Sequence, residues 1–243
     1  MRVLLTMILS LTTLLAAAQN AEDILSKVDE NMASDNRIVE ASMTIHGKRN
    51  SRTITSRTYS VGTKQSFTEY LTPAREQGTK MLKLDNQLWI YSPSTDRTIQ
   101  LSGHMLRQSV MGSDLSYEDM MDDRKLTEVY TATLAGTEDV DGRKTFVLEL
   151  AAKVSDVAYH SRKIWVDTEH FVPLREDLFA KSGQLLKRTT MSDVKQIDGR
   201  WFPISIVFKD MLKQGDGTEY KMTSIKFNQK IPEYIFTKAA LKQ

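Results

Sequence analysis

The chain has 243 residues, 40% of them hydrophobic, and its 33 Lys and Arg residues nearly balance its 31 Asp and Glu residues. This balance gives no electrostatic reason to expect nucleic-acid binding. Cysteine is absent, which excludes disulfide bonds, zinc sites built on cysteine and a lipid anchor on an N-terminal cysteine. The stability of the protein must therefore come from its hydrophobic core.

Residues 1–18 have the three parts of a secretory signal peptide. A positive charge at Arg2 precedes an apolar run over residues 3–15, and three alanines at 16–18 provide a cleavage site. The apolar run is shorter than the roughly 20 residues of a transmembrane helix. We therefore expect cleavage after residue 18 and a single exported domain over residues 19–243, without a membrane anchor.

An amphipathic helix is expected at the start of this domain. Asn20 provides an N-cap, and Glu22 and Asp23 complement the positive end of the helix dipole. The apolar stripe consists of Ile24, Leu25, Val28 and Met32. A helix with one apolar stripe needs a partner surface, and the strands that follow provide it.

Short segments with alternating polar and apolar residues fill most of the remaining chain, which is typical of an antiparallel meander. The expected strands cover residues 40–45, 51–61, 67–71, 81–84, 88–91, 98–101, 128–134, 145–151, 158–166, 174–179, 184–194, 201–208 and 220–227. Hairpin turns are expected at Asp141-Gly142, Ser182-Gly183, Asp198-Gly199 and Asp216-Gly217. The strands at 88–91 and 164–166 are apolar on both faces, which indicates that both faces are covered.

A twisted open sheet rarely exceeds about ten strands, so a sheet of this size must curl, split or close. The expected fold class is α+β but mainly β: a strongly curved antiparallel sheet that forms an unclosed barrel, with helices on its concave side. Residues 231–236 should form a closing helical turn whose aromatic side chains dock on the sheet. Such a barrel contains an apolar cavity unless side chains fill it, and the sequence leaves both possibilities open.

Residues 102–123 interrupt the strand pattern with a helical insert, which we call the lid. Ser116 and Asp119 have the spacing of a capping box, so a helix should begin at Tyr117. A break at Gly112 separates this helix from an earlier helical piece. Two short helical pieces joined at a glycine are suited to open and close.

Methionines are concentrated in and near the lid. Methionine is unbranched and polarizable, so a group of them can line a surface that adapts to irregular apolar ligands. The residues concerned are Met81, Met105, Met111, Met120 and Met121. For any one of them, ordinary core filling is the stronger explanation, and only their grouping raises the ligand-surface interpretation to an equal footing.

The sequence contains no catalytic or metal-binding motif. The four histidines lack the spacing of a metal site, and there is no nucleophile elbow, phosphate loop or dinucleotide fingerprint. The acidic residues of the lid lack the pattern of a calcium loop, and we interpret them and a basic cluster as solvated faces. These two groups are Asp114, Glu118, Asp119, Asp122 and Asp123, and Lys48, Arg49, Arg52 and Arg57. We expect no enzymatic activity, no metal and no cofactor.

The order of these features resembles the outer-membrane lipoprotein-sorting family, the relatives of the LolA and LolB carriers. The most specific segments are MGSDLSYEDM at residues 111–120 and WVDTEHFVPLRE at 165–176. The segment LWIYSPSTDRT and the closing IPEYIFT are also similar. The resemblance covers essentially the whole chain after the signal peptide.

This resemblance implies a periplasmic carrier of a Gram-negative bacterium that is not an enzyme. Its partners would be the acyl chains of lipoproteins or other lipids, with an inner-membrane transporter as donor, an outer-membrane acceptor and only transient membrane contact. The carrier would be a monomer, and an arginine whose position the sequence does not reveal would hold the lid shut. The resemblance thus favours binding of acyl chains in a hydrophobic cavity and transport toward the outer membrane.

The expected ligand-binding residues come from the lid and from the wall of the sheet. They are Met105, Leu106, Val110, Met111, Leu115, Tyr117 and Met120 from the lid, and Met43, Phe67, Leu88 and Ile90 from the wall. Two alternatives stay open: an accessory or sensor module that docks an envelope regulator or a lipid-exporting transporter through the same sheet, and a hydrolase with scattered catalytic residues.

Overall fold

The computed structural model describes residues 21–47 and 50–243. The proposed signal peptide and the Asn20 cap lie outside these residues. The first described element is a helix over residues 21–32, as expected. Among the described residues, no helix is both long enough and apolar enough to cross a membrane.

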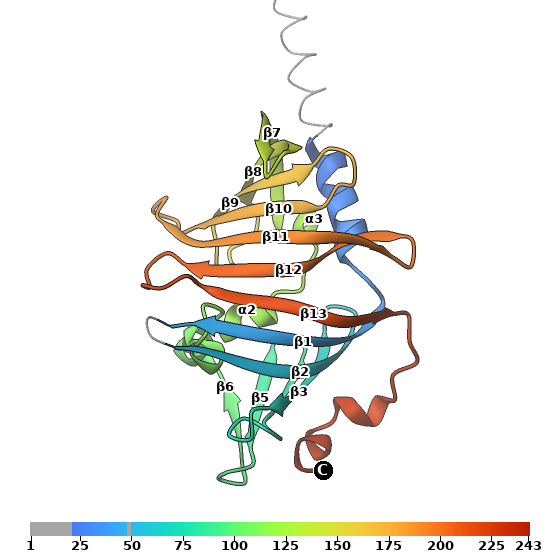
Figure 1. Ribbon diagram of the computed structural model, residues 1–243, viewed down its shortest axis with the longest axis vertical. Helices are drawn as coiled ribbons and strands as arrows, with labels where there is room; N and C mark the ends of the chain where they lie inside the picture. The colour runs from blue at the N-terminus through green and yellow to red at the C-terminus, as the bar shows by residue number, and fades with distance from the viewer. Residues whose placement is uncertain (1–20, 48–49) are drawn as a thin grey trace, which may run out of the picture.

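The strands form one 13-stranded antiparallel sheet that is not closed into a barrel (Figure 1). Its order is β6-β5-β4-β3-β2-β1-β13-β12-β11-β10-β9-β8-β7. The first half contains β1 (Asn36–His46), β2 (Ser51–Val61), β3 (Gln65–Thr72), β4 (Lys80–Leu84), β5 (Gln87–Ser92) and β6 (Arg97–Leu101). The second half contains β7 (Tyr130–Val140), β8 (Arg143–Ala152), β9 (Ser161–Asp167), β10 (Pro173–Phe179), β11 (Leu185–Ile197), β12 (Arg200–Asp210) and β13 (Thr218–Phe227). The expected unclosed barrel is confirmed.

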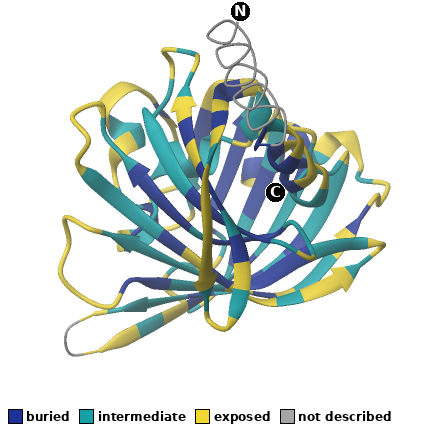
Figure 2. Ribbon diagram, turned by 90° about the horizontal axis from the view of Figure 1, so that it is seen from above, coloured by how far each residue is buried: buried dark blue, intermediate teal, exposed yellow. Residues whose placement is uncertain are grey.

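The sheet curves around its inner face, seen from above in Figure 2. The N-terminal helix packs its stripe against the inner face of β7, β8 and β9, where Leu25, Leu148 and Ile164 are completely buried. A short helix is only marginally stable on its own in water. Burial of its apolar stripe, at roughly 25 cal/mol for each Å² of apolar surface removed from water, supplies the missing stability. The helix thus fills one end of the barrel.

The other end of the sheet is covered on its outer face by the C-terminal segment. This segment consists of the 3-10 turns η3 (Glu233–Phe236) and η4 (Lys238–Lys242), whose Phe236 and Leu241 pack on Leu82 and Trp89. The prediction that strand 88–91 is covered on both faces is therefore confirmed. Of the closing aromatic residues, Phe236 docks on the sheet, whereas Tyr234 is exposed.

The lid connects β6 to β7. It contains the 3-10 turns η1 (Gly103–Arg107) and η2 (Val110–Gly112) and the helix α2 (Tyr117–Met121), and a further helix α3 (Leu126–Val129) follows it. Helix α2 begins at Tyr117, and both hydrogen bonds of the Ser116–Asp119 capping box are present. Met111 and Gly112 have φ angles of 51° and 74°, so the break expected at Gly112 is a left-handed turn.

Candidate functional site

A cavity of about 280 Å³ lies between the lid and the inner face of the sheet. Its walls come from β1, β2, β3, β12 and β13, from Met32 of the N-terminal helix and from the lid. The lining is mainly apolar at the lid end, where Met43, Tyr70 and Leu115 contribute. The sheet and the lid therefore enclose a mainly apolar space that their own side chains do not fill.

Four of the predicted ligand-binding residues line this cavity, namely Met43, Val110, Leu115 and Met120. Six others pack in the apolar cluster beneath the lid without lining the cavity: Leu88, Ile90, Met105, Leu106, Met111 and Tyr117. Placing Phe67 on the cavity wall was wrong, because it packs on the outer face of β3 with Leu82 and Phe236. Both faces of β3 are apolar in part, so alternation alone did not identify the inner one.

Strands β12 and β13 supply much of the lining that the sequence analysis missed. Phe202, Ile206 and Phe208 alternate along β12 and so form one apolar face. From the sequence, this alternation predicted only a strand and not a cavity wall. Tyr220, Met222 and Ile225 of β13 complete this wall. A row of hydroxyl side chains on β2 and β3 was also missed: Ser56, Thr58, Ser60, Ser66 and Thr68.

The tyrosines of the cavity are neutral groups. Burial raises the pKa of Tyr70, whose hydroxyl donates to the sulfur of Met81, and burial raises the pKa of Tyr220 to about 12. Burial also raises the pKa of Tyr117 beside them. The lining under the lid therefore carries no ionised phenol at neutral pH, which suits an apolar ligand.

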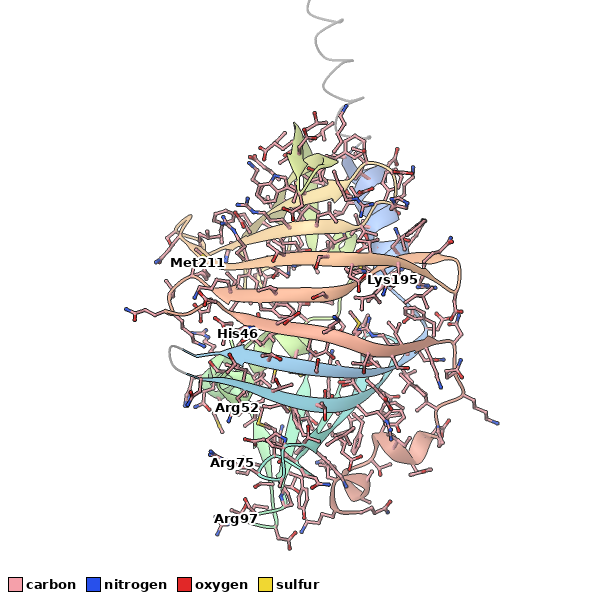
Figure 3. The ribbon with its side chains drawn as sticks, in the orientation of Figure 1. His46, Arg52, Arg75, Arg97, Lys195 and Met211 are labelled. Carbon is pink, nitrogen blue, oxygen red and sulfur yellow. The ribbon has the colours of Figure 1, made fainter. Side chains whose placement is uncertain are left out.

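Arg52, at the lid-proximal end of β2, holds the left-handed turn of the lid. Its guanidinium donates to the carbonyl of Met111 and pairs with Glu76 at 3.4 Å. Figure 3 shows Arg52 on the same margin of the sheet as His46 and Met211. The interpretation of Arg52 as part of a solvated face was incomplete, because its side chain is 39% exposed but also contacts the lid. Lys48 and Arg49 lie outside the described residues.

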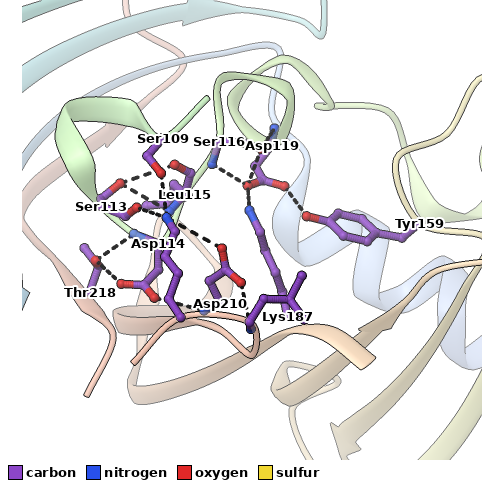
Figure 4. A network of polar contacts seen from close by, with 12 residues as sticks. Ser109, Ser113, Asp114, Leu115, Ser116, Asp119, Tyr159, Lys187, Asp210 and Thr218 are labelled. Carbon is purple, nitrogen blue, oxygen red and sulfur yellow. Dashed lines mark hydrogen bonds and ion pairs between the residues drawn. The ribbon is translucent and has the colours of Figure 1, made fainter. Parts of the chain in front are cut away.

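A second set of hydrogen bonds joins the lid to the β12–β13 hairpin (Figure 4). The Thr218 hydroxyl donates to the Asp114 carboxylate at 2.8 Å, and the Asp210 backbone N–H donates to the same carboxylate at 3.0 Å. Lys213 donates to the carbonyl of Ser113 at 2.9 Å. At Gly217 of this hairpin, φ is 93° and an added Cβ would lie 2.6 Å from the carbonyl oxygen of Phe208, so the hairpin requires glycine.

Asp119 links α2 to the far wall of the barrel. Its carboxylate accepts hydrogen bonds from Lys187 on β11 and, at 2.5 Å, from the hydroxyl of Tyr159. Burial acts to raise the pKa of Asp119, but Lys187, Tyr159 and a hydrogen bond from Ser116 outweigh it and hold the pKa below its usual value. Asp119 is therefore ionised, and its side chain is only 14% exposed. For Asp114 and Asp119, the interpretation of the lid carboxylates as a solvated face was wrong, because both are mostly buried and bonded to the sheet.

The lowered pKa of Asp119 predicts acid sensitivity of the lid. A carboxylate whose pKa falls on folding adds stability above its unfolded pKa of about 3.9, and that stability is lost as the pH falls through the folded pKa. We expect the wild type to be more stable than D119N at neutral pH, with an advantage that shrinks below about pH 4. Urea denaturation of both proteins between pH 7 and pH 3 measures this difference. A constant difference over that range would contradict the prediction.

Next to the lid, a buried ion cluster lies under the N-terminal helix. Arg162 on β9 is 3.6 Å from Glu176 on β10 and 3.9 Å from Asp122, which follows α2. Burial raises the pKa of Glu176 in spite of Arg162. The carboxylates of Asp119 and Asp122 thus meet cations from two strands of the second half of the sheet. Among the described residues, no group of three His, Asp or Glu side chains is placed to hold a metal ion.

Comparison with known proteins agrees with this architecture. A family model described only as an uncharacterized protein family matches residues 62–243, and no curated protein matches the sequence. The structure resembles a LolA superfamily protein from Nitrosomonas europaea with a TM-score of 0.75 and 27% identity, covering 90% of this chain and 98% of that one. The chain belongs to the LolA-like family.

Two further solved structures share the LolA-like fold over nearly their whole length. A DUF1329 family protein from Desulfovibrio piger has a TM-score of 0.84 and 26% identity, covering 93% of this chain and 99% of that one. A domain from Vibrio parahaemolyticus described as a putative outer membrane lipoprotein-sorting protein has a TM-score of 0.81 and 24% identity. It covers 93% of this LolA-like chain and is itself covered completely.

Proposed function

We propose that this LolA-like protein is a periplasmic carrier that holds the acyl chains of lipoproteins or other lipids and moves them toward the outer membrane. The observation that supports the proposal is the cavity itself, a mainly apolar space under the lid. Each CH₂ group removed from water contributes about 0.8 kcal/mol, so such a space favours acyl chains strongly. The protein acts by binding and release and catalyses no reaction.

The closed cavity is small for such a ligand. Its volume of about 280 Å³ lies just below the range of roughly 300–1,000 Å³ for typical ligand pockets. Loading must therefore displace the lid, whose short elements contact the walls through the apolar cluster beneath it and through a few polar contacts. Short elements of this kind open locally at low cost, so the lid releases its ligand without unfolding of the sheet.

The proposed partners follow from this cycle. An inner-membrane transporter would deliver the acylated molecule, an outer-membrane acceptor would remove it, and contact with either membrane would be transient. The proposed carrier is a monomer between these steps. Arg52 is our candidate for the arginine that holds the lid shut, because it joins β2 to the strained Met111–Gly112 turn.

Native mass spectrometry of the protein purified from an envelope fraction tests the proposal. We expect about one lipid or acylated peptide for each chain, which extraction then identifies. A second sample is stripped of lipid and mixed with dodecanol or with a fluorescent fatty acid. If the purified protein is empty and the stripped protein binds neither probe, it is not a lipid carrier.

A further inference from the structure

The inner face of strands β1 to β4 changes from charged to apolar along the strands. Strand pairing places Arg37, Ser60, Ser66 and Lys83 side by side in one row across β1, β2, β3 and β4. Two residues further along, the corresponding row is Val39, Thr58, Thr68 and Met81. Residues that pair in this way point to the same side of the sheet. The cavity wall therefore has one polar end.

The lid covers the opposite, apolar end of the same wall. Met43 and Ile54 form the row that lies six residues from Arg37 along β1, and both pack beneath the lid. Six residues of strand span about 20 Å. One acyl chain fills half of a hydrocarbon core about 30 Å thick, or about 15 Å. The wall is thus long enough for an acyl chain with its polar end at the charged row.

Two cations share one carboxylate at the charged end. The Lys83 ammonium lies 2.8 Å from the Asp123 carboxylate and 2.7 Å from the carbonyl of Met121, and Arg37 lies 3.5 Å from the same carboxylate. The Lys83 side chain is 3% exposed, because β4 is buried on both faces. The described ion pairs thus leave one excess positive charge at this end, shared between buried Lys83 and Arg37, whose side chain is 29% exposed. If Asp123 moved away, buried Lys83 would require another anionic partner.

Asp123 is the replaceable member of this group. It lies on the connection between α2 and α3, outside the sheet, and its side chain is 32% exposed. Asp123 lines the cavity. Lys83 is not part of the lining, but it is paired across the sheet with Ser66, which is. Movement of the lid would withdraw Asp123 and present the Lys83 ammonium to the cavity.

We infer that the cavity takes amphiphiles with a single anionic headgroup, a carboxylate or a phosphate, which binds Lys83 and Arg37 in place of Asp123. The inference rests on the proposed carrier function and narrows its ligand class. The serine hydroxyls between the two cations donate further hydrogen bonds to the headgroup, and the acyl chain extends toward the lid. Because the headgroup displaces Asp123, binding also detaches the α2–α3 connection from the sheet.

Binding of three ligands with the same chain to the lipid-free protein tests this inference: dodecanoate, dodecyl phosphate and dodecanol. We expect the wild type to bind at least one anion about tenfold or more tightly than the alcohol, as for a charge-assisted hydrogen bond at a buried site. The stronger anion assigns the headgroup source, a fatty acid or a phospholipid. Binding of dodecanol without any preference for an anion would overturn the inference and leave the carrier function intact.

Two substitutions on one strand separate the headgroup site from general stability. K83M should remove the preference for anions and leave dodecanol affinity unchanged. K80M is the matched control, because Lys80 is equally part of β4 but faces the C-terminus, where it donates to the carbonyl of Gln243. K80M should retain the preference. An anion preference that survives in folded K83M would overturn the inference.

A third variant covers the case in which K83M does not fold. D123N retains both cations and removes their competing carboxylate, so it should bind dodecanoate or dodecyl phosphate several-fold more tightly than the wild type. Its affinity for dodecanol should be unchanged. Unchanged or weaker anion binding by D123N would show that the headgroup does not occupy the place of Asp123. Failure of all three ligands to bind the wild type would instead reject the carrier function.

Discussion

Replacement of Leu115 by Asp is expected to abolish acyl-chain binding, with a loss of affinity of at least about a hundredfold. Leu115 lines the cavity from the lid, so the new carboxylate would face the ligand chain. Transfer of an ionised carboxylate into an apolar space without a partner costs several kcal/mol. Because the lid is a separate insert between β6 and β7, the sheet should remain folded.

Fluorescent fatty-acid titration measures the affinity of this variant, and circular dichroism monitors the sheet. L212D is the matched control, because Leu212 is 63% exposed at the tip of the β12–β13 hairpin and does not line the cavity. We expect L212D to bind like the wild type. Equal binding by L115D and L212D would show that the lid does not form part of the ligand site.

Replacement of Lys187 by Met should release the lid from the second half of the sheet. Removal of one partner of a buried ion pair costs about 3–5 kcal/mol, and the remaining 14% exposure of both side chains favours the lower end of this range. The lid can instead open and return Asp119 to water. The loss therefore affects lid closure more than global stability, and a change of about 3 kcal/mol corresponds to a change of roughly 150-fold in the closing equilibrium.

Hydrogen exchange of the backbone amides in residues 105–121 measures this effect. We expect exchange in the lid to become much faster, while amides of β8 and β9 keep their protection. K195M is the control on the same strand, because within the described part of the chain Lys195 pairs only with exposed Asp193, and it lies at the opposite margin of the sheet from Met211 (Figure 3). Unchanged lid exchange in K187M would contradict the role of this ion pair.

Features that depend on neighbouring residues were predictable from the sequence. The capping box of Ser116 and Asp119 set the start of α2, because both of its hydrogen bonds lie within four residues. The limits of β2 agree with the predicted segment 51–61, since period-two alternation ends at a glycine turn. The stripe that contains Leu25 and Val28 identified the buried face of the first helix, because the helical spacing of a stripe is also a local feature.

Features that depend on distant pairing were not predictable. Asp119 resembled a solvated residue because its partner Lys187 is remote in the sequence and meets it only when the sheet curls. Arg52 was misinterpreted for the same reason, as its acceptor is a backbone carbonyl of the lid. The face of Phe67 depended on the C-terminal segment, which covers the outside of β3 and buries an apolar residue there.

The order of the strands also determines when the cavity can form during folding. Neighbouring strands are consecutive in the chain everywhere in the described sheet except at β1 and β13, where Val39 pairs with Ile225. Each half of the sheet is a meander of local contacts, which form quickly, whereas this central seam must close a loop of almost the whole domain. We therefore expect the seam to form late. Val39 and Ile225 both line the cavity, so a chain that is still folding has no complete cavity. The cavity can therefore enclose an apolar ligand only after the two halves of the sheet have joined.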